Sequence, residues 1–266
     1  MMVLPLFKKE VKANYKIFII FILIISLYAG VIVAMYDPKL GKSLEMMSES
    51  MPELFAAFSM INASSSLIEF VTNYLFGFIM IIIPFVFMLI MISRLISRYI
   101  DKGSLAYLLA TPRNRSKIIL TQLLTVLLGV LLLIVYETIL VIVCGKVMFN
   151  ELVPINEFLV LNSGLFGLHC FFTALVYLSA CSFNETKWSI GLGGGLGMIF
   201  ILIQMLSQVS DKFDFLKYLT PLTLFDTNRL IELDIQAILL AGVLYLLAFI
   251  FIVVAINIFK KRDLSL

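Results

Sequence analysis

The chain has 266 residues, of which 62% are hydrophobic and 14% are charged, and its formal net charge is +3. These proportions leave too few polar side chains to cover a soluble globule of this size, so the expected solvent is lipid. The basic residues occur in short clusters between apolar runs, which argues against a nucleic-acid-binding groove and favours a role in membrane topology.

The first 16 residues predict an interfacial helix. At helical spacing, Leu4, Phe7 and Val11 share one face, and a set of lysines occupies another. This pattern suits a helix that lies in the headgroup plane, with its apolar face toward the acyl chains. No small-residue cleavage pattern follows, so we expect the segment to remain as the start of the first membrane anchor.

Six apolar runs follow, and each is long enough to cross the hydrocarbon core as a helix that rises about 1.5 Å per residue. They cover residues 17–36, 70–93, 118–143, 158–183, 188–207 and 236–259. No linker separates two parts of the chain. The sequence therefore predicts an all-α, polytopic membrane protein, with residues 1–266 forming a single transmembrane domain.

The basic residues predict the orientation of the chain, because Lys and Arg in short loops stay on the cytoplasmic side. Of the 20 Lys and Arg residues, 14 fall on the side that holds both termini. The other side has only six and carries most of the acidic residues. We therefore expect both termini in the cytoplasm, with the protein a multi-pass component of the cell (inner) membrane.

The loop between the second and third spans contains a short amphipathic segment. Leu105, Leu108 and Leu109 share a helical face, and Thr111-Pro112 has the form of an N-cap followed by a first-turn proline. Two interpretations fit this pattern. The helix either rests on lipid headgroups, or docks into a groove on a soluble partner with its leucines as the anchor.

This loop carries a resemblance to a known family. KGSLAYLLATPRNRSKIILTQ at Lys102–Gln122 resembles the stretch that precedes the third span in ABC-2 type transporter permeases, the membrane subunits of ATP-binding-cassette exporters. The similarity extends to LFKKEVKANYK at the start, MPELFAAF at Met51–Phe58, LKYLTPLTLFD at Leu216–Asp226 and FKKRDL at Phe259–Leu264. The motifs keep their order along almost the whole chain.

The resemblance implies an ABC-2 (type V exporter-like) fold, in a dimer of six-span subunits whose second permease is identical or homologous. It also implies that residues 102–116 form a coupling helix against a separate ABC ATPase, present in two copies. The residues expected at that contact are Lys102, Leu105, Leu108, Leu109, Pro112, Arg113 and Arg115.

The sequence contains no Walker A loop for binding ATP. Gly41-Lys42-Ser43 ends like a Walker A loop, but Tyr36 stands where the required first glycine would be. We therefore expect no cofactor here, with ATP and Mg²⁺ bound by the partner ATPase.

Few polar side chains lie inside the spans. Glu137, in the third span, is expected either near a substrate path or subunit interface, or as a packed structural acid. Gln204 and Gln208 lie four residues apart in the fifth span, where they either line an outer cavity or form interhelical hydrogen bonds.

The chain offers no predicted metal or catalytic site. His169 is the single histidine, so we expect it to form a hydrogen bond in helix packing. The three cysteines, Cys144, Cys170 and Cys181, lack metal-binding spacing and fall in or beside apolar runs. An intramembrane enzyme would need a nucleophile and base or a ligand cluster, and neither is visible.

Two further features concern helix packing. Gly191/Gly195 and Gly193/Gly197 form two overlapping GxxxG pairs, which predict close approach of helix backbones. Pro84 lacks a backbone N–H group and is expected to kink the second span.

The sequence thus predicts the permease subunit of an ABC transporter that exports a hydrophobic or amphipathic substrate, such as a peptide, lipid-like molecule or drug. Two alternatives stay open. One is a non-transporting sensor or immunity subunit on the same scaffold, and the other is an ion-coupled secondary transporter, although the inverted repeats typical of that class are not evident.

Overall fold

The computed structural model describes residues 3–36, 46–58, 66–101, 115–150 and 153–261. All regular structure in these ranges is helical. The elements are α1 (Leu4–Ala34), α3 (Pro52–Ala57), α4 (Leu67–Val71), η1 (Thr72–Phe76), α5 (Ile79–Ile92), η2 (Ser93–Ser97), α6 (Arg98–Asp101), α8 (Arg115–Phe149), α9 (Ile155–Ser182), α10 (Thr186–Val209), η3 (Asp211–Leu219), η4 (Pro221–Leu224), α11 (Thr227–Ile231) and α12 (Ile235–Lys261).

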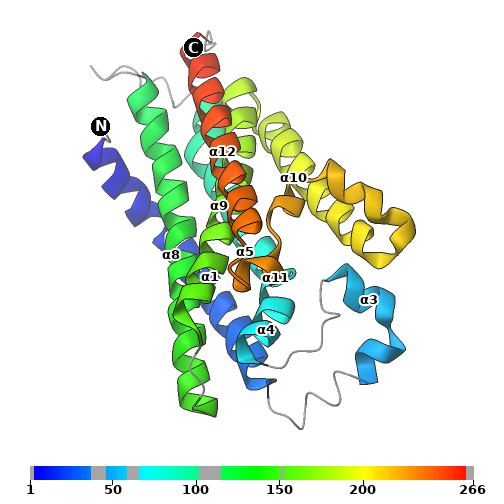
Figure 1. The fold of residues 1–266 in the computed structure, drawn as a ribbon. Helices are drawn as coiled ribbons and strands as arrows, with labels where there is room; N and C mark the ends of the chain where they lie inside the picture. Colours follow the sequence, from blue (N-terminus) through cyan, green and yellow to red (C-terminus); the bar gives the residue numbers. More distant parts are fainter. Residues whose placement is uncertain (1–2, 37–45, 59–65, 102–114, 151–152, 262–266) are drawn as a thin grey trace.

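Six of the described helical segments are long and apolar enough to cross a membrane: α1, α5 with η2, α8, α9, α10 and α12. Each overlaps one of the six predicted runs, so the prediction of six spans is confirmed. An even number of crossings brings the two ends of the chain to the same end of the bundle (Figure 1). We call this the proximal end and the opposite one, where α3, α4 and α11 lie, the distal end.

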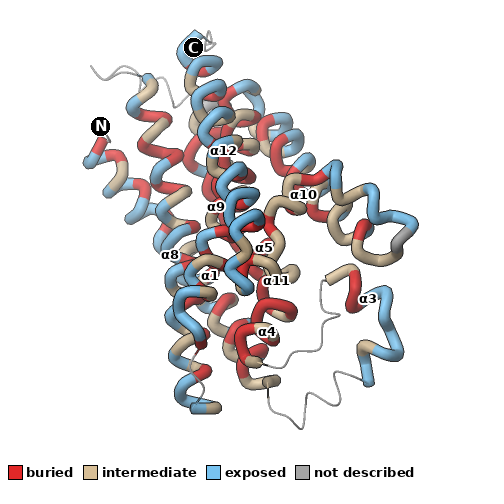
Figure 2. The backbone as a smooth tube through the Cα atoms, viewed as in Figure 1, coloured by how far each residue is buried: buried red, intermediate tan, exposed pale blue. Residues whose placement is uncertain are grey.

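The α9 helix forms the centre of the bundle. It packs against α5, α8, α10 and α12, and most of its residues are buried, whereas the outward faces of α1, α8 and α12 are exposed (Figure 2). The exposed side chains on these helices are mainly Leu, Ile, Val and Phe. An apolar outer surface of this kind is suited to contact with lipid.

The α1 helix runs without interruption from Leu4 to Ala34. The residues expected to form an interfacial helix are therefore continuous with the first span, and the structure has no helix boundary at residue 16. Their inward face carries Leu6, Glu10 and Asn14, all buried. The phenol of Tyr99 donates a hydrogen bond to Glu10 Oε1 over 3.1 Å, which joins this segment to α6.

The second span differs from its predicted bounds. A break at Gly77 and Phe78 divides the predicted run 70–93. The end of α4 and η1 lie before the break, and the long apolar segment after it extends from Ile79 to Ser97. Both η1 and η2 are wound as π-helices. Glycine is a poor helix former, and Phe78 has a non-helical φ of −145°. Pro84 lies inside α5 and does not end it.

One of the two glycine pairs in α10 makes the predicted close contact. A Cβ on Gly193 would lie 2.8 Å from the Val176 Cα atom of α9, and one on Gly197 would lie 2.6 Å from the Phe85 ring of α5. By contrast, nothing lies within 4 Å of a Cβ built on Gly191 or Gly195. The face of α10 that carries Gly193 and Gly197 therefore packs into the bundle.

The distal connection between α10 and α12 is built from short capped helices. Thr220 caps η4, and the Asp226 carboxylate accepts a hydrogen bond from the Arg229 amide at the start of α11. Asp234 caps α12 by accepting from the Gln236 amide over 2.9 Å. Side-chain caps satisfy backbone N–H groups that have no partner within the helix. They hold this loop in a defined shape at the distal end.

Candidate functional site

A cavity of about 660 Å³ lies between α3, the distal half of α10, the η3–η4 loop and the start of α11. We call it the distal cavity. Its described walls include apolar, uncharged polar and charged side chains. Among them are Phe76, Phe78, Ile81, Ile201, Met205, Leu222 and Phe225; Gln204, Ser207, Gln208, Ser210, Thr223, Thr227 and Asn228; and Glu53, Asp214, Lys217 and Asp226.

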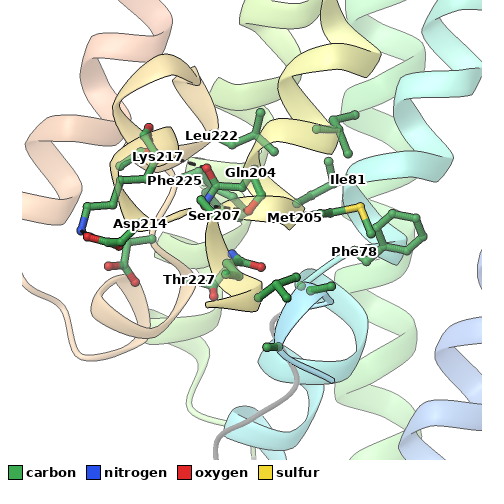
Figure 3. A pocket seen from close by; sticks show the side chains of 18 of the residues that line it. Phe78, Ile81, Gln204, Met205, Ser207, Asp214, Lys217, Leu222, Phe225 and Thr227 are labelled. Atoms are coloured by element: carbon green, nitrogen blue, oxygen red, sulfur yellow. Dashed lines mark hydrogen bonds and ion pairs between the residues drawn. The ribbon is translucent and has the colours of Figure 1, made fainter. Parts of the chain in front are cut away.

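The two sides of the distal cavity differ in chemistry. Figure 3 shows Phe78, Ile81 and Met205 on one side, with Asp214 and Lys217 on the other. Gln204 and Ser207 of α10 lie between them. The cavity therefore presents an apolar wall on the side of Phe78 and Met205. The opposite wall, which we call the polar wall, carries the charged pair together with Leu222 and Phe225.

The single lysine among the described lining residues is paired. Lys217 Nζ lies 2.9 Å from Asp214 Oδ1 and 2.7 Å from Oδ2. The hydrogen bond from Lys217 to Asp214 raises the pKa of the lysine above its usual value, so Lys217 stays charged and its charge is balanced locally.

Two other carboxylates of the cavity have no basic partner among the described residues. Glu53 lies on α3 and is exposed, and Asp226 uses one oxygen to cap α11. The ion pairs that the structure shows in its described part are Lys217 with Asp214 and Arg229 with Asp234. The described lining of the distal cavity, with three carboxylates and one lysine, therefore carries a net negative charge.

A second, smaller cavity of about 370 Å³ adjoins the first. Asn228 lines both. Its charged lining residues in the described part of the chain are Glu69, Glu157 and Glu232, and none of its lining residues there is basic. The acidic character of the distal cavity thus continues into its neighbour.

The structure places both glutamines predicted from the fifth span in the wall of the distal cavity. The hydroxyl of Thr223 donates to Gln204 Oε1 over 3.3 Å, so Gln204 also holds η4 against α10. The two interpretations proposed for Gln204, cavity lining and hydrogen bonding, are therefore compatible. Its role in a substrate path stays a prediction.

Glu137 lies elsewhere, inside the subunit. Its side chain is 0% exposed, and neither of its carboxylate oxygens has a hydrogen-bond partner among the described residues. It lines neither described cavity. The structure thus does not join Glu137 to Gln204 and Gln208, and a role for it in transport stays a prediction.

His169 forms the hydrogen bond in helix packing that the sequence favoured. Its Nε2 atom donates to the carbonyl oxygen of Met80 over 2.9 Å. In an α-helix that oxygen would accept from the amide of residue 84, and residue 84 is a proline without an amide hydrogen. The single histidine in α9 therefore satisfies a carbonyl that the proline in α5 leaves open.

Most of the predicted coupling residues lie outside the described part of the chain, namely Lys102, Leu105, Leu108, Leu109, Pro112 and Arg113. Arg115 is described, and it begins α8 with an exposed side chain. The described residues on both sides of residues 102–114 are anchored to the N-terminal segment: Tyr99 contacts Glu10, and the Val3 amide donates to Thr121 Oγ1 over 2.9 Å.

Sequence reasoning missed the carboxylates of the two cavities. Glu53, Asp226 and Glu157 belong to three separate loops or helix starts, and each is unremarkable within its own segment. The available signal was an excess of acidic residues on the side of the membrane opposite the termini. That excess predicts which side of the membrane is acidic, but it does not predict which carboxylates lie together in a cavity.

The described residues contain no group of three or more His, Cys, Asp or Glu side chains placed to hold a metal ion. No curated protein matches the chain in a sequence comparison. A comparison with protein-family models matches residues 4–264 to the family described as ABC-2 family transporter protein.

Proposed function

The chain belongs to the ABC-2 transporter family, and from this premise we propose that it is the permease subunit of an ABC exporter for a hydrophobic or amphipathic substrate. Family membership makes it a multi-pass membrane subunit without a catalytic domain. It also implies an ABC ATPase partner in general. The match over nearly the whole chain is the observation that carries the proposal.

The energy source in this proposal is a separate ATPase that binds ATP and Mg²⁺ and acts in two copies. Two permeases, identical or homologous, would assemble through part of the apolar outer surface. Both termini and residues 102–116 would face the cytoplasm, as the distribution of Lys and Arg favours. Residues 102–116 would then be the segment that contacts the ATPase.

Two observations support the amphipathic character of the substrate. The distal cavity has an apolar wall and a polar wall, and its volume falls in the range of about 300–1,000 Å³ that small-molecule sites occupy. Under the proposed orientation the cavity opens on the outer side, where an exported molecule leaves. Peptides, lipid-like molecules and drugs all combine apolar and polar parts.

The coupling assignment is tested by purification. The tagged permease would be expressed with its ATPase, and co-elution would be compared between wild type and Leu105→Asp/Leu109→Asp. We expect wild type to retain the ATPase and the variant to lose it, because a charged leucine face cannot enter an apolar groove. Phe215→Asp/Leu219→Asp is the matched control, since both residues are exposed on the distal η3.

Monodisperse elution of both variants in detergent establishes that they are folded. If Leu105→Asp/Leu109→Asp keeps the ATPase while folded, residues 102–116 are not the contact. If wild type retains no ATPase, the exporter proposal has no source of energy. That result would favour the two alternatives, a non-transporting sensor or immunity subunit and an ion-coupled secondary transporter.

A further inference from the structure

Acidic residues outnumber basic ones in the described lining of the two adjoining distal cavities, and this excess indicates the charge of the substrate. The inference rests on the proposed function. Glu53, Asp214 and Asp226 line the distal cavity, where the single described cation, Lys217, is held by both oxygens of Asp214. Beyond Asn228, the second cavity adds further carboxylates and no basic residue among its described lining. A bound anion would be repelled here, and a bound cation attracted.

The apolar wall adds a second requirement. Phe78, Ile81 and Met205 come from two spans, α5 with its preceding turn and α10, and they face the polar wall across the cavity (Figure 3). A small inorganic cation would leave this wall without a partner. A molecule with an apolar body and a positive charge satisfies both sides, because apolar side chains line most ligand sites while a few polar groups fix the orientation.

We propose that the distal cavity binds an amphipathic cation. The apolar body of the ligand lies against Phe78 and Met205, and its positive charge lies toward Glu53 and Asp226. These two carboxylates are the groups available for the ligand, since Asp214 is already paired with Lys217. The acidic second cavity extends the attractive field beyond Asn228 and accommodates a further positive charge on a longer ligand.

The test uses two ions of nearly the same size and shape and of opposite charge, tetraphenylphosphonium and tetraphenylborate. The full chain is reconstituted in nanodiscs of phosphatidylcholine, with and without its ATPase, and binding is measured by equilibrium dialysis against empty nanodiscs. We expect saturable binding of tetraphenylphosphonium above the lipid background. We expect tetraphenylborate to bind the protein at least about tenfold more weakly.

Variants separate charge from apolar contact. Glu53→Gln/Asp226→Asn is expected to weaken tetraphenylphosphonium binding about tenfold, because each solvent-accessible charge pair contributes on the order of a threefold change. Asparagine is itself a good N-cap, so α11 keeps its start. Glu185→Gln removes one charge at the proximal start of α10 and should leave binding unchanged. Met205→Ala should weaken binding through the apolar wall.

Either of two results overturns the proposal: tetraphenylphosphonium binding that is no greater than in empty nanodiscs, or binding that Glu53→Gln/Asp226→Asn leaves unchanged while the protein elutes as a folded species. Neither result affects the ATPase co-elution test. Conversely, a chain that binds the cation and retains no ATPase would overturn the exporter proposal, and with it the role of the cation as an exported substrate, while the binding site itself would stand.

Discussion

The two halves of α10 have different surroundings, although both are α-helical: the proximal half packs tightly against α9, and the distal half lines a cavity. In the proximal half, glycines let the backbone of α10 approach α9 until no room remains for a Cβ at Gly193. In the distal half, Gln204, Met205 and Gln208 line an open cavity. Figure 1 shows the helix diverging from the rest of the bundle toward its distal end, where it turns back through η3.

This difference suggests that one end of the bundle stabilises the subunit and the other end binds ligand. Between apolar helices in lipid, close van der Waals packing and interhelical hydrogen bonds drive association, since burial of apolar surface gives little gain there. The proximal region, with its glycines and buried hydroxyls, should therefore determine stability. The distal region, with exposed charges and an open cavity, should contribute little to stability and determine what is bound.

The largest expected effect comes from filling the tight contact. Gly193→Ala places a Cβ 2.8 Å from backbone and side-chain carbon atoms of α9, and overpacking of this kind costs about 1–3 kcal/mol. Gly191→Ala, two residues away on the open face, should be neutral or stabilising by up to roughly 1 kcal/mol. Thermal unfolding in detergent, followed by gel filtration of the tagged chain, measures both. Equal effects would refute the one-sided packing of α10.

The next effect concerns the bond between α9 and α5. His169→Leu removes the donor to the Met80 carbonyl and leaves that buried oxygen unsatisfied, at a cost of about 1–3 kcal/mol. In a Pro84→Ala background the amide of residue 84 becomes available to Met80, so the same change should cost much less. A double-mutant cycle of unfolding free energies measures the coupling. Additive effects would mean that the histidine does not compensate for the proline.

A smaller effect is expected at the proximal start of α10. The hydroxyls of Ser97 and Ser189 lie 2.6 Å apart, both buried, and Ser179 donates to the Ser189 carbonyl over 2.7 Å. Ser97→Ala should lower the unfolding free energy by about 1 kcal/mol. Ser182→Ala is the control, because its exposed hydroxyl bonds only within α9. If the two variants unfold alike, the buried serine contact does not stabilise the proximal region.

The smallest effect is expected in the distal loop. The Gln236 amide and the Arg229 side chain lower the pKa of Asp234 below its ordinary value near 3.8. A lowered folded-state pKa stabilises the fold above the unfolded-state value and loses that contribution as the pH falls through the folded-state value. Asp234→Asn should therefore be slightly less stable than wild type at pH 7, and the gap should close below about pH 3.8.

The same measurement with Glu232→Gln provides the reference, since that exposed neighbour has no ion pair among the described residues. Added salt should also shrink the effect of Asp234→Asn, because the pair with Arg229 is solvent-accessible. A large, salt-independent loss would place a main source of stability in the distal region and reverse the comparison.

The sequence alone determined the number and approximate place of the spans. A backbone in lipid must satisfy its own hydrogen bonds, so an apolar run of about 20 residues has one folded option, a helix. Composition therefore sufficed for the presence of α8, α9, α10 and α12. The bounds of α9, α10 and α12 lie within a few residues of the prediction, whereas α8 continues to Phe149, beyond the predicted end at residue 143. It did not suffice at Gly77 and Phe78, where a break that follows the π-helix η1 interrupts an otherwise apolar run.

The tertiary structure decided which of several equivalent patterns is used. Two glycine pairs predicted close packing equally well, and only the rotation of α10 against α9 and α5 selects Gly193 and Gly197. Likewise, the sequence predicted a kink at Pro84 and a hydrogen bond for His169 separately. That His169 donates to the Met80 carbonyl, which Pro84 leaves without an amide partner, follows only from the packing of α9 beside α5. The distal cavity depends on carboxylates from separate segments, and sequence periodicity cannot show which loops meet because it reports only neighbours along one helix.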